Sequence, residues 1–110
     1  MIIYEVNLTL DADIYQDYLN WLKPHMKKML TFNGFLNAEL IENKESNGQK
    51  YYVSARYYID NQSALEDYFN HYAKDMRQEG MDLFKNKFSA SRNIYNIIEM
   101  FNCQKEKNTA

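Results

Sequence analysis

The chain has 110 residues, 45% of them hydrophobic and 15% aromatic, and its 13 basic and 15 acidic residues leave a formal charge of −2. This length and composition are typical of one globular domain and exclude the charged, weakly apolar chains that remain disordered. The near-neutral balance excludes a global field that would attract nucleic acid or an anionic membrane surface.

Several further classes are excluded by residue counts. The single cysteine, Cys103, excludes an intramolecular disulfide, and no spacing of His, Cys, Asp and Glu is typical of a metal site. Three glycines in the whole chain leave no phosphate-binding loop, so we expect no metal and no cofactor. The first ten residues, MIIYEVNLTL, contain neither a signal peptide nor a transmembrane run, which predicts a cytoplasmic protein without a membrane partner.

The predicted elements begin with a strand over residues 2–10, where apolar and mixed positions alternate. A helix follows from Ile14 to Leu30, and we expect Pro24 to kink or restart it because proline lacks the N–H that a helix interior uses. A second strand begins at Phe35. Asn47 and Gly48 predict the turn region that leads into a third strand over residues 51–59.

The second half of the chain predicts a helix and a last strand. Apolar spacing from Ser63 onward predicts the helix, with Gly80 ending it or joining it to a short second helix. The stretch FSASRNIYNII alternates like a strand, yet residues 94–101 also have helical spacing, so either structure is open there. We expect one domain over residues 1–101 and a flexible C-terminal tail over residues 102–110.

The order of these elements is βαββαβ, which predicts an α+β, ferredoxin-like fold. In this fold a four-stranded antiparallel sheet carries its helices on one face, and the fourth strand lies beside the first. The other face of the sheet is left open.

The predicted open face mixes large apolar side chains with charges and amides. Its expected members are Ile3, Glu5, Asn7, Phe35, Asn37, Glu39, Ile41, Tyr52, Ser54, Arg56 and Tyr58, with Arg92 near Glu5. A solvated face seldom carries so many apolar groups, and a sealed core seldom carries unpaired charges. We therefore expect two copies to pack face to face as a homodimer, a dimeric α/β barrel around a partly polar space.

The two arginines of this face have three interpretations. Arg56 and Arg92 pair with Glu39 and Glu5 and fix the register of the dimer, or they bind a ligand carboxylate or phosphate. A bulge that turns Arg92 toward solvent is the third interpretation. Saturated pairs with little free volume favour the first, and a cavity with unpaired convergent groups favours the second.

The two histidines have plainer interpretations. His71 is expected on an exposed flank of the second helix. His25 stands among lysines and is expected in a solvated basic patch.

Three stretches, NGFLNAEL, YYVSARYYIDNQSALEDYF and FSASR, carry a resemblance to known proteins. Through them the chain resembles a family of short bacterial proteins that share a domain of unknown function. The glycine-phenylalanine opening of the second strand is also similar to the dimeric α/β-barrel superfamily, which includes antibiotic-biosynthesis and haem-degrading monooxygenases. The resemblance implies a face-to-face homodimer with a cavity between sheet and helices.

The same resemblance implies catalytic candidates. Haem-degrading members use an asparagine of the first strand with a tryptophan and a histidine of the second helix. Asn7 matches the asparagine and His71 approximates the histidine, but Trp21 lies in the first helix, so we expect no haem. Two hypotheses follow: a non-catalytic dimer that binds a small ligand, or a cofactor-independent monooxygenase acting on an aromatic or polyketide-like compound. In the second, Asn7, Arg56, Arg92 or His71 would orient the substrate.

Overall fold

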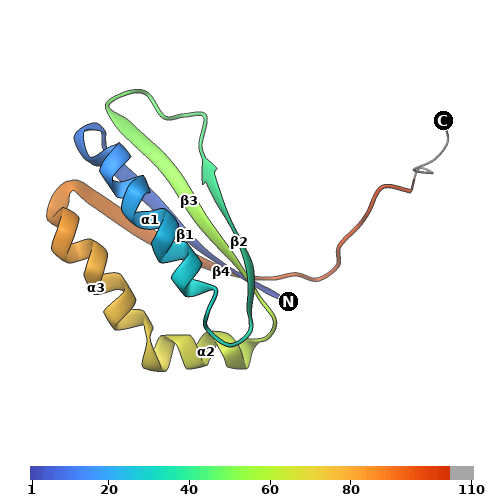
Figure 1. The fold of residues 1–110 in the computed structure, drawn as a ribbon. Coiled ribbons are helices and arrows are strands. Elements are labelled where there is room, and N and C mark those ends of the chain that lie inside the picture. Colours follow the sequence, from blue (N-terminus) through green and yellow to red (C-terminus); the bar gives the residue numbers. More distant parts are fainter. Residues whose placement is uncertain (105–110) are drawn as a thin grey trace.

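The computed structural model describes residues 1–104, which form a sheet with helices on one side (Figure 1). Its elements are β1 (Ile2–Asp11), the 3-10 turn η1 (Ala12–Ile14), α1 (Tyr15–Met29), β2 (Phe35–Glu42), β3 (Lys50–Ile59), α2 (Gln62–His71), α3 (Ala73–Phe84), the 3-10 turn η2 (Lys85–Lys87) and β4 (Phe88–Asn96). The predicted βαββαβ order is confirmed, and the second helix is divided into α2 and α3.

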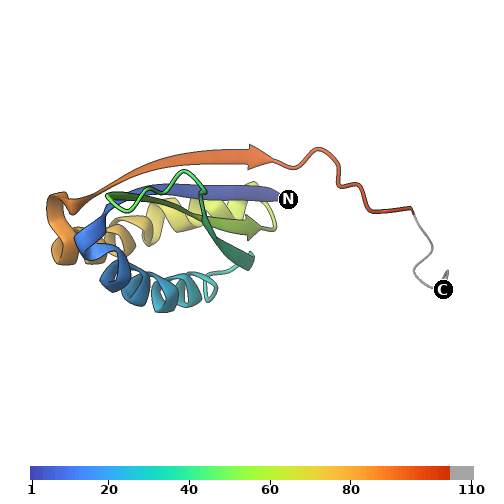
Figure 2. The same ribbon diagram turned by 90° about the horizontal axis from the view of Figure 1, so that it is seen from above.

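The four strands are antiparallel and lie in the order β2-β3-β1-β4, so β4 lies beside β1 as predicted. Figure 2 shows α1, α2 and α3 on one side of this sheet and the opposite face uncovered. The α+β, ferredoxin-like fold is therefore confirmed.

The core lies between the sheet and the helices, and it is rich in tyrosine. Because alternate strand residues point to opposite faces, Tyr4 and Tyr57 both face the helices, where they are almost fully buried. Their ring centroids lie 6.0 Å apart, and the Tyr4 centroid lies 5.3 Å from that of Phe69. These tyrosines bring polar atoms into an otherwise apolar layer.

Helix α1 runs from Tyr15 to Met29 and includes Pro24 in its interior. The predicted restart at Pro24 is therefore wrong. Proline in a helix interior costs about 3 kcal/mol. The helix buries Tyr18, Leu22 and Met26 against the sheet. Burial of an apolar side chain such as Leu22 or Met26 contributes about 1.5–3 kcal/mol. Packing on the sheet outweighs the local cost.

Gly80 lies inside α3, so the prediction that it ends or divides the helix is wrong. The break occurs earlier, at Tyr72, which separates α2 from α3. Gly80 is needed for packing instead, because a Cβ at this position would lie 2.9 Å from Cη2 of Trp21.

Strand β2 begins with a bulge. Phe35 pairs with Ile59 and Asn37 with Tyr58, which leaves Leu36 as an extra residue. Phe35 is therefore buried in the core, and the prediction that it lies on the open face is wrong. Leu36, whose alternation predicts burial, is 51% exposed.

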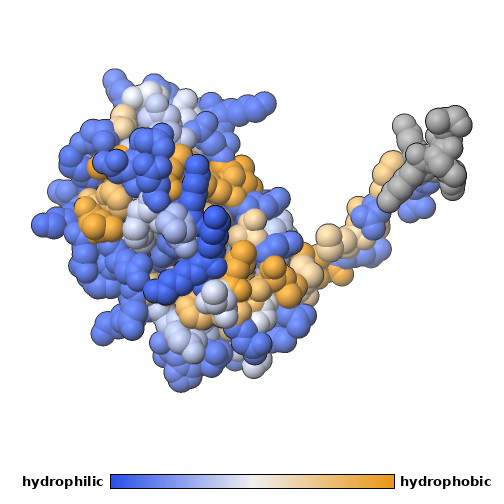
Figure 3. All heavy atoms as spheres, in the orientation of Figure 1, coloured by the Kyte–Doolittle hydropathy of each residue, from blue (hydrophilic) through white to orange (hydrophobic). Residues whose placement is uncertain are grey.

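Strand β4 ends at Asn96, so residues 94–96 are strand, and residues 97–104 form neither helix nor strand. Figures 1 and 3 show this segment leaving the body of the protein, with hydrophobic side chains along it. Ile98 is 97% and Phe101 is 83% exposed. Residues 105–110 of the predicted tail lie outside the described residues, so the domain boundary at 101 stays a prediction. No helix among residues 1–104 is long and apolar enough to cross a membrane.

Candidate functional site

Glu5 is a buried carboxylate at the centre of the open sheet face. Arg56 donates two hydrogen bonds to its Oε2, from Nε at 3.1 Å and from Nη2 at 2.8 Å. Asn7 donates to Oε1 at 3.1 Å. Burial raises the pKa of Glu5, but hydrogen bonds from Arg56, Asn7 and Asn93, with the Arg56 charge, hold it below its ordinary value. Glu5 is therefore ionised and fully partnered.

The rest of the open face continues this network. Tyr58 donates to Oε1 of Glu39 at 2.9 Å, and Nη1 of Arg56 lies 3.9 Å from the same oxygen. Ser54 donates to Oδ1 of Asn7 at 2.6 Å. The structure thus brings together five of the predicted site residues, namely Glu5, Asn7, Glu39, Arg56 and Tyr58. Their use as a ligand site or a dimer face stays a prediction.

Arg92 does not belong to this network. Its partner across the β1–β4 pair is Val6, whereas Glu5 pairs with Asn93. Arg92 therefore shares the helix-facing side of β4 with Phe88 and Ala90. The prediction that Arg92 stands near Glu5 on the open face is wrong. The difference is one residue of register, which in a strand exchanges the two faces.

A cavity of about 450 Å³ lies between the sheet and the helices α1 and α3. Its aromatic lining consists of Tyr4, Tyr18, Trp21, Tyr57, Tyr68 and Phe88. Cavities that hold small ligands commonly measure about 300–1,000 Å³. The space therefore suits a small molecule of moderate size.

Three cationic side chains also line the cavity: Arg77 of α3, Lys85 at the end of α3, and Arg92 of β4. The lining includes no Asp or Glu, and none of the three lies within 4.0 Å of a carboxylate in the described part of the chain. In a protein of net charge −2, this cavity is a local positive region.

Arg77 is held in place by aromatic residues. Its Nη2 donates to the hydroxyl of Tyr4 at 3.1 Å, and its Cζ lies 5.8 Å from the ring centre of Phe69. Its Nε is buried and has no hydrogen-bond partner among residues 1–104.

His25 also lines the cavity, so the predicted solvated patch is wrong for this residue. Its side chain is only 11% exposed, and its ring centroid lies 4.4 Å from that of Trp21. Burial lowers the pKa of His25, although Glu79, whose Oε2 lies 3.7 Å from Nδ1, acts in the opposite direction. His25 is therefore mainly neutral at pH 7 and able to accept a proton.

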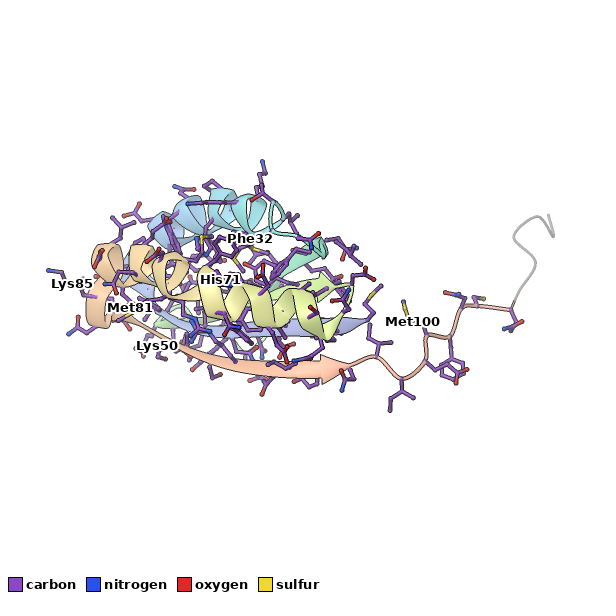
Figure 4. All side chains as sticks on the ribbon, turned by 90° about the horizontal axis from the view of Figure 1, so that it is seen from below. Phe32, Lys50, His71, Met81, Lys85 and Met100 are labelled. Carbon is purple, nitrogen blue, oxygen red and sulfur yellow. The ribbon has the colours of Figure 1, made fainter. Side chains whose placement is uncertain are left out.

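The predicted catalytic pair is not brought together. Asn7 lies on the open face, whereas His71 is an exposed residue of α2 whose Nε2 lies 3.5 Å from Oδ1 of Asp67 (Figure 4). Neither lines the cavity under the helices. Within residues 1–104 no three His, Cys, Asp or Glu side chains are placed to hold a metal ion.

Sequence reasoning missed Arg77, Lys85 and His25. A signal for Arg77 does exist, because Ala73, Arg77 and Gly80 follow the i, i+4, i+7 spacing of one helix face, and Ala73 and Gly80 are buried. No comparable signal exists for Lys85, whose place depends on the turn between α3 and β4.

These features define a ferredoxin-like α+β protein with a positively charged cavity between sheet and helices. Residues 1–98 match the family model described as Domain of unknown function (DUF4286), and the chain belongs to that family. The predicted resemblance to a family that shares a domain of unknown function is thereby confirmed. Comparison with curated proteins gave no match.

Solved structures of similar fold include three informative examples. A provisionally assigned antibiotic biosynthesis monooxygenase from Deinococcus radiodurans is 18% identical, with a TM-score of 0.74 over 96% of this chain and 100% of that chain. SnoaB, a cofactor-independent oxygenase from Streptomyces nogalater, is 9% identical, with a TM-score of 0.64 over 90% and 95%. A dimeric ferredoxin-like protein from an uncultured marine organism is 12% identical, with a TM-score of 0.60 over 93% and 98%. Identities this low show a shared fold alone.

Proposed function

We propose that the protein is a cytoplasmic homodimer that binds a small molecule in the cavity between the sheet and the helices α1 and α3. The observation that carries this proposal is the convergence of three cations without carboxylate partners, Arg77, Lys85 and Arg92, on one aromatic-lined cavity. No ion pair among residues 1–104 explains why these three charges border one cavity.

The homodimer is supported by the chemistry of the open face. Ile41 and Tyr95 are exposed there beside the saturated Glu5–Arg56 network. A network whose members are already partnered loses less on burial than lone charges would, so a second copy can cover it. One similar fold is that of a protein described as dimeric.

Native mass spectrometry of the purified protein tests both parts of the proposal. We expect a dimer mass at micromolar concentration and an adduct that is absent from an Ala90→Trp variant, in which the new side chain fills the cavity. A monomer contradicts the dimer. A wild-type protein with no adduct and no thermal stabilisation by any aromatic compound contradicts ligand binding.

A cofactor-independent oxygenase is the second candidate, and His25 is the observation that favours it. Oxygenation without a cofactor needs a base that removes a proton from the substrate. His25 has a lowered pKa, is mainly neutral at pH 7 and borders the cavity. Oxygen uptake with phenolic polycyclic compounds, compared between wild type and His25→Gln, tests this role. Binding of such compounds without uptake contradicts it.

A further inference from the structure

We infer that the ligand is a flat aromatic molecule with one acidic group, and that Arg77 and Arg92 hold that group. This inference rests on the proposed function, because it names the chemical class of the molecule in the same cavity. It depends on where the charges of the cavity lie and on the absence of acidic lining residues.

The two arginines approach the cavity from different elements, α3 and β4. Burial raises the pKa of Tyr68, and the charges of Arg77 and Arg92 both act against that rise, as expected for two guanidinium groups near one ring. Two like charges that border one cavity repel each other. An anion between them would remove this repulsion and accept hydrogen bonds from both planar groups.

The carboxylate nearest to His25 does not compete with a bound anion for Arg77 and Arg92. Glu79, the carboxylate beside His25, is shared with Lys28, whose Nζ lies 3.3 Å from its Oε1. Glu79 does not line the cavity. The cations that line the cavity therefore have no carboxylate partner within residues 1–104 and can pair with a bound anion.

The body of the ligand is defined by the aromatic walls. Tyr4 and Tyr57 form part of the sheet side, and Tyr18 and Trp21 come from α1. Gly80 adds no side chain opposite Trp21, whose ring fills the space where its Cβ would be. Flat aromatic groups make the most favourable contacts with such walls.

Lys85 gives an independent sign of function. Its backbone has φ 48° and ψ −119°, a conformation that favours glycine over any residue with a Cβ. Figure 4 shows Lys85 at the end of α3, near Met81, which also lines the cavity. A strained residue that places a charge at a cavity is the pattern found at ligand sites.

Two fluorescent probes of the same shape test the inference: anilinonaphthalene sulfonate, which is an anion, and phenylnaphthylamine, which lacks the sulfonate. We expect wild type to bind the sulfonate at least tenfold more tightly than the neutral probe. Arg92→Met keeps the apolar stem and should remove most of that preference while leaving the neutral probe unchanged. Arg92 is exposed on an edge strand, so the variant should fold, which circular dichroism verifies.

The controls separate this inference from the proposed function. Lys74→Ala removes an exposed charge of α3, the helix that contains Arg77. Lys74 does not line the cavity, so this variant should resemble wild type. Equal binding of both probes, or an equal loss of preference in Lys74→Ala and Arg92→Met, overturns the anionic ligand. Failure of Ala90→Trp to weaken either probe, or binding of neither probe, overturns the cavity as a binding site and with it the proposed function.

Discussion

Trp21 and Gly80 are in direct contact, since a Cβ at position 80 would lie 2.9 Å from Cη2 of the indole. This contact joins α1 to α3 and forms part of the cavity lining. The position of the indole therefore depends on a residue with no side chain.

Gly80→Ala should move the Trp21 ring and change the cavity. Helix propensity favours alanine by about 1 kcal/mol, and the overlap with the indole acts against that gain, so the free energy of unfolding should change little. We expect a shifted tryptophan emission maximum and weaker probe binding. Gln78→Ala, on the exposed side of α3, is the control. Unchanged emission and unchanged affinity would contradict the role of this contact.

Gly34→Ala should destabilise the fold strongly. Gly34 has φ 83°, and its Cβ would lie 2.4 Å from Cβ of Ala64. Gly48 has the same φ of 83° with nothing within 4 Å, so Gly48→Ala is a matched control for backbone strain. We expect about 1–2 kcal/mol from the strain in both variants, and a further loss of about 1–3 kcal/mol in Gly34→Ala from overlap. Urea denaturation measures the free energy of unfolding of both variants. Equal losses of stability would contradict the importance of the close approach between position 34 and Ala64 of α2.

Lys85→Gly should raise stability and weaken anion binding at the same time. Relief of the positive φ should add about 1–2 kcal/mol to the free energy of unfolding. Loss of the ammonium group should reduce affinity for the anionic probe more than for the neutral probe. Stability and affinity that rise together would show that Lys85 has no part in binding.

The Glu5 carboxylate should make stability depend on acid. The pKa of Glu5 in the folded protein lies below the ordinary value of 4.5. Its full contribution to the free energy of unfolding is therefore present above pH 4.5. As the pH falls through the lowered pKa, the contribution is lost. Urea denaturation of wild type and Glu5→Gln between pH 3 and pH 7 should therefore give curves that converge at low pH. Glu66→Gln, an exposed residue of α2, is the control. A constant difference across this range would mean that Glu5 does not titrate with a lowered pKa.

Residues 97–104 should contribute to the proposed dimer. Exposed apolar side chains beyond the end of β4, such as Ile98 and Phe101, would lose contact with water if the second copy of the proposed dimer packed on them. Truncation after Asn96 should therefore raise the dimer dissociation constant by at least tenfold in sedimentation experiments. Truncation after Gln104 is the control. An unchanged constant would show that this segment does not bind the partner.

The sequence predicts the fold well because its strands are defined locally. Alternation along residues 2–10 and 51–59 places each side chain on one of two faces without any knowledge of the neighbouring strand. Leu36 shows the limit of this rule, since a single bulged residue exchanges the faces of Phe35 and Leu36.

The cavity could not be predicted because it depends on tertiary packing. Phe88 and Ala90 indicate that Arg92 faces the helices, yet an arginine in that row has an evident reason only once a cavity is present. Arg77 and His25 meet the cavity through the packing of α1 against α3, which involves Trp21 and Gly80. No local pattern records that contact.

Because Arg92 pairs with Val6, the charge that β4 brings to the cavity depends on whether the turn before β4 has an odd or an even number of residues. One residue added within Lys85–Lys87, with the start of β4 moved along the sheet, would bring Asn93 to the cavity side and send Arg92 to the open face. Two added residues would restore the original arrangement. A single insertion before β4 would therefore remove one of the three cations of the cavity, while Arg77 and Lys85 would stay.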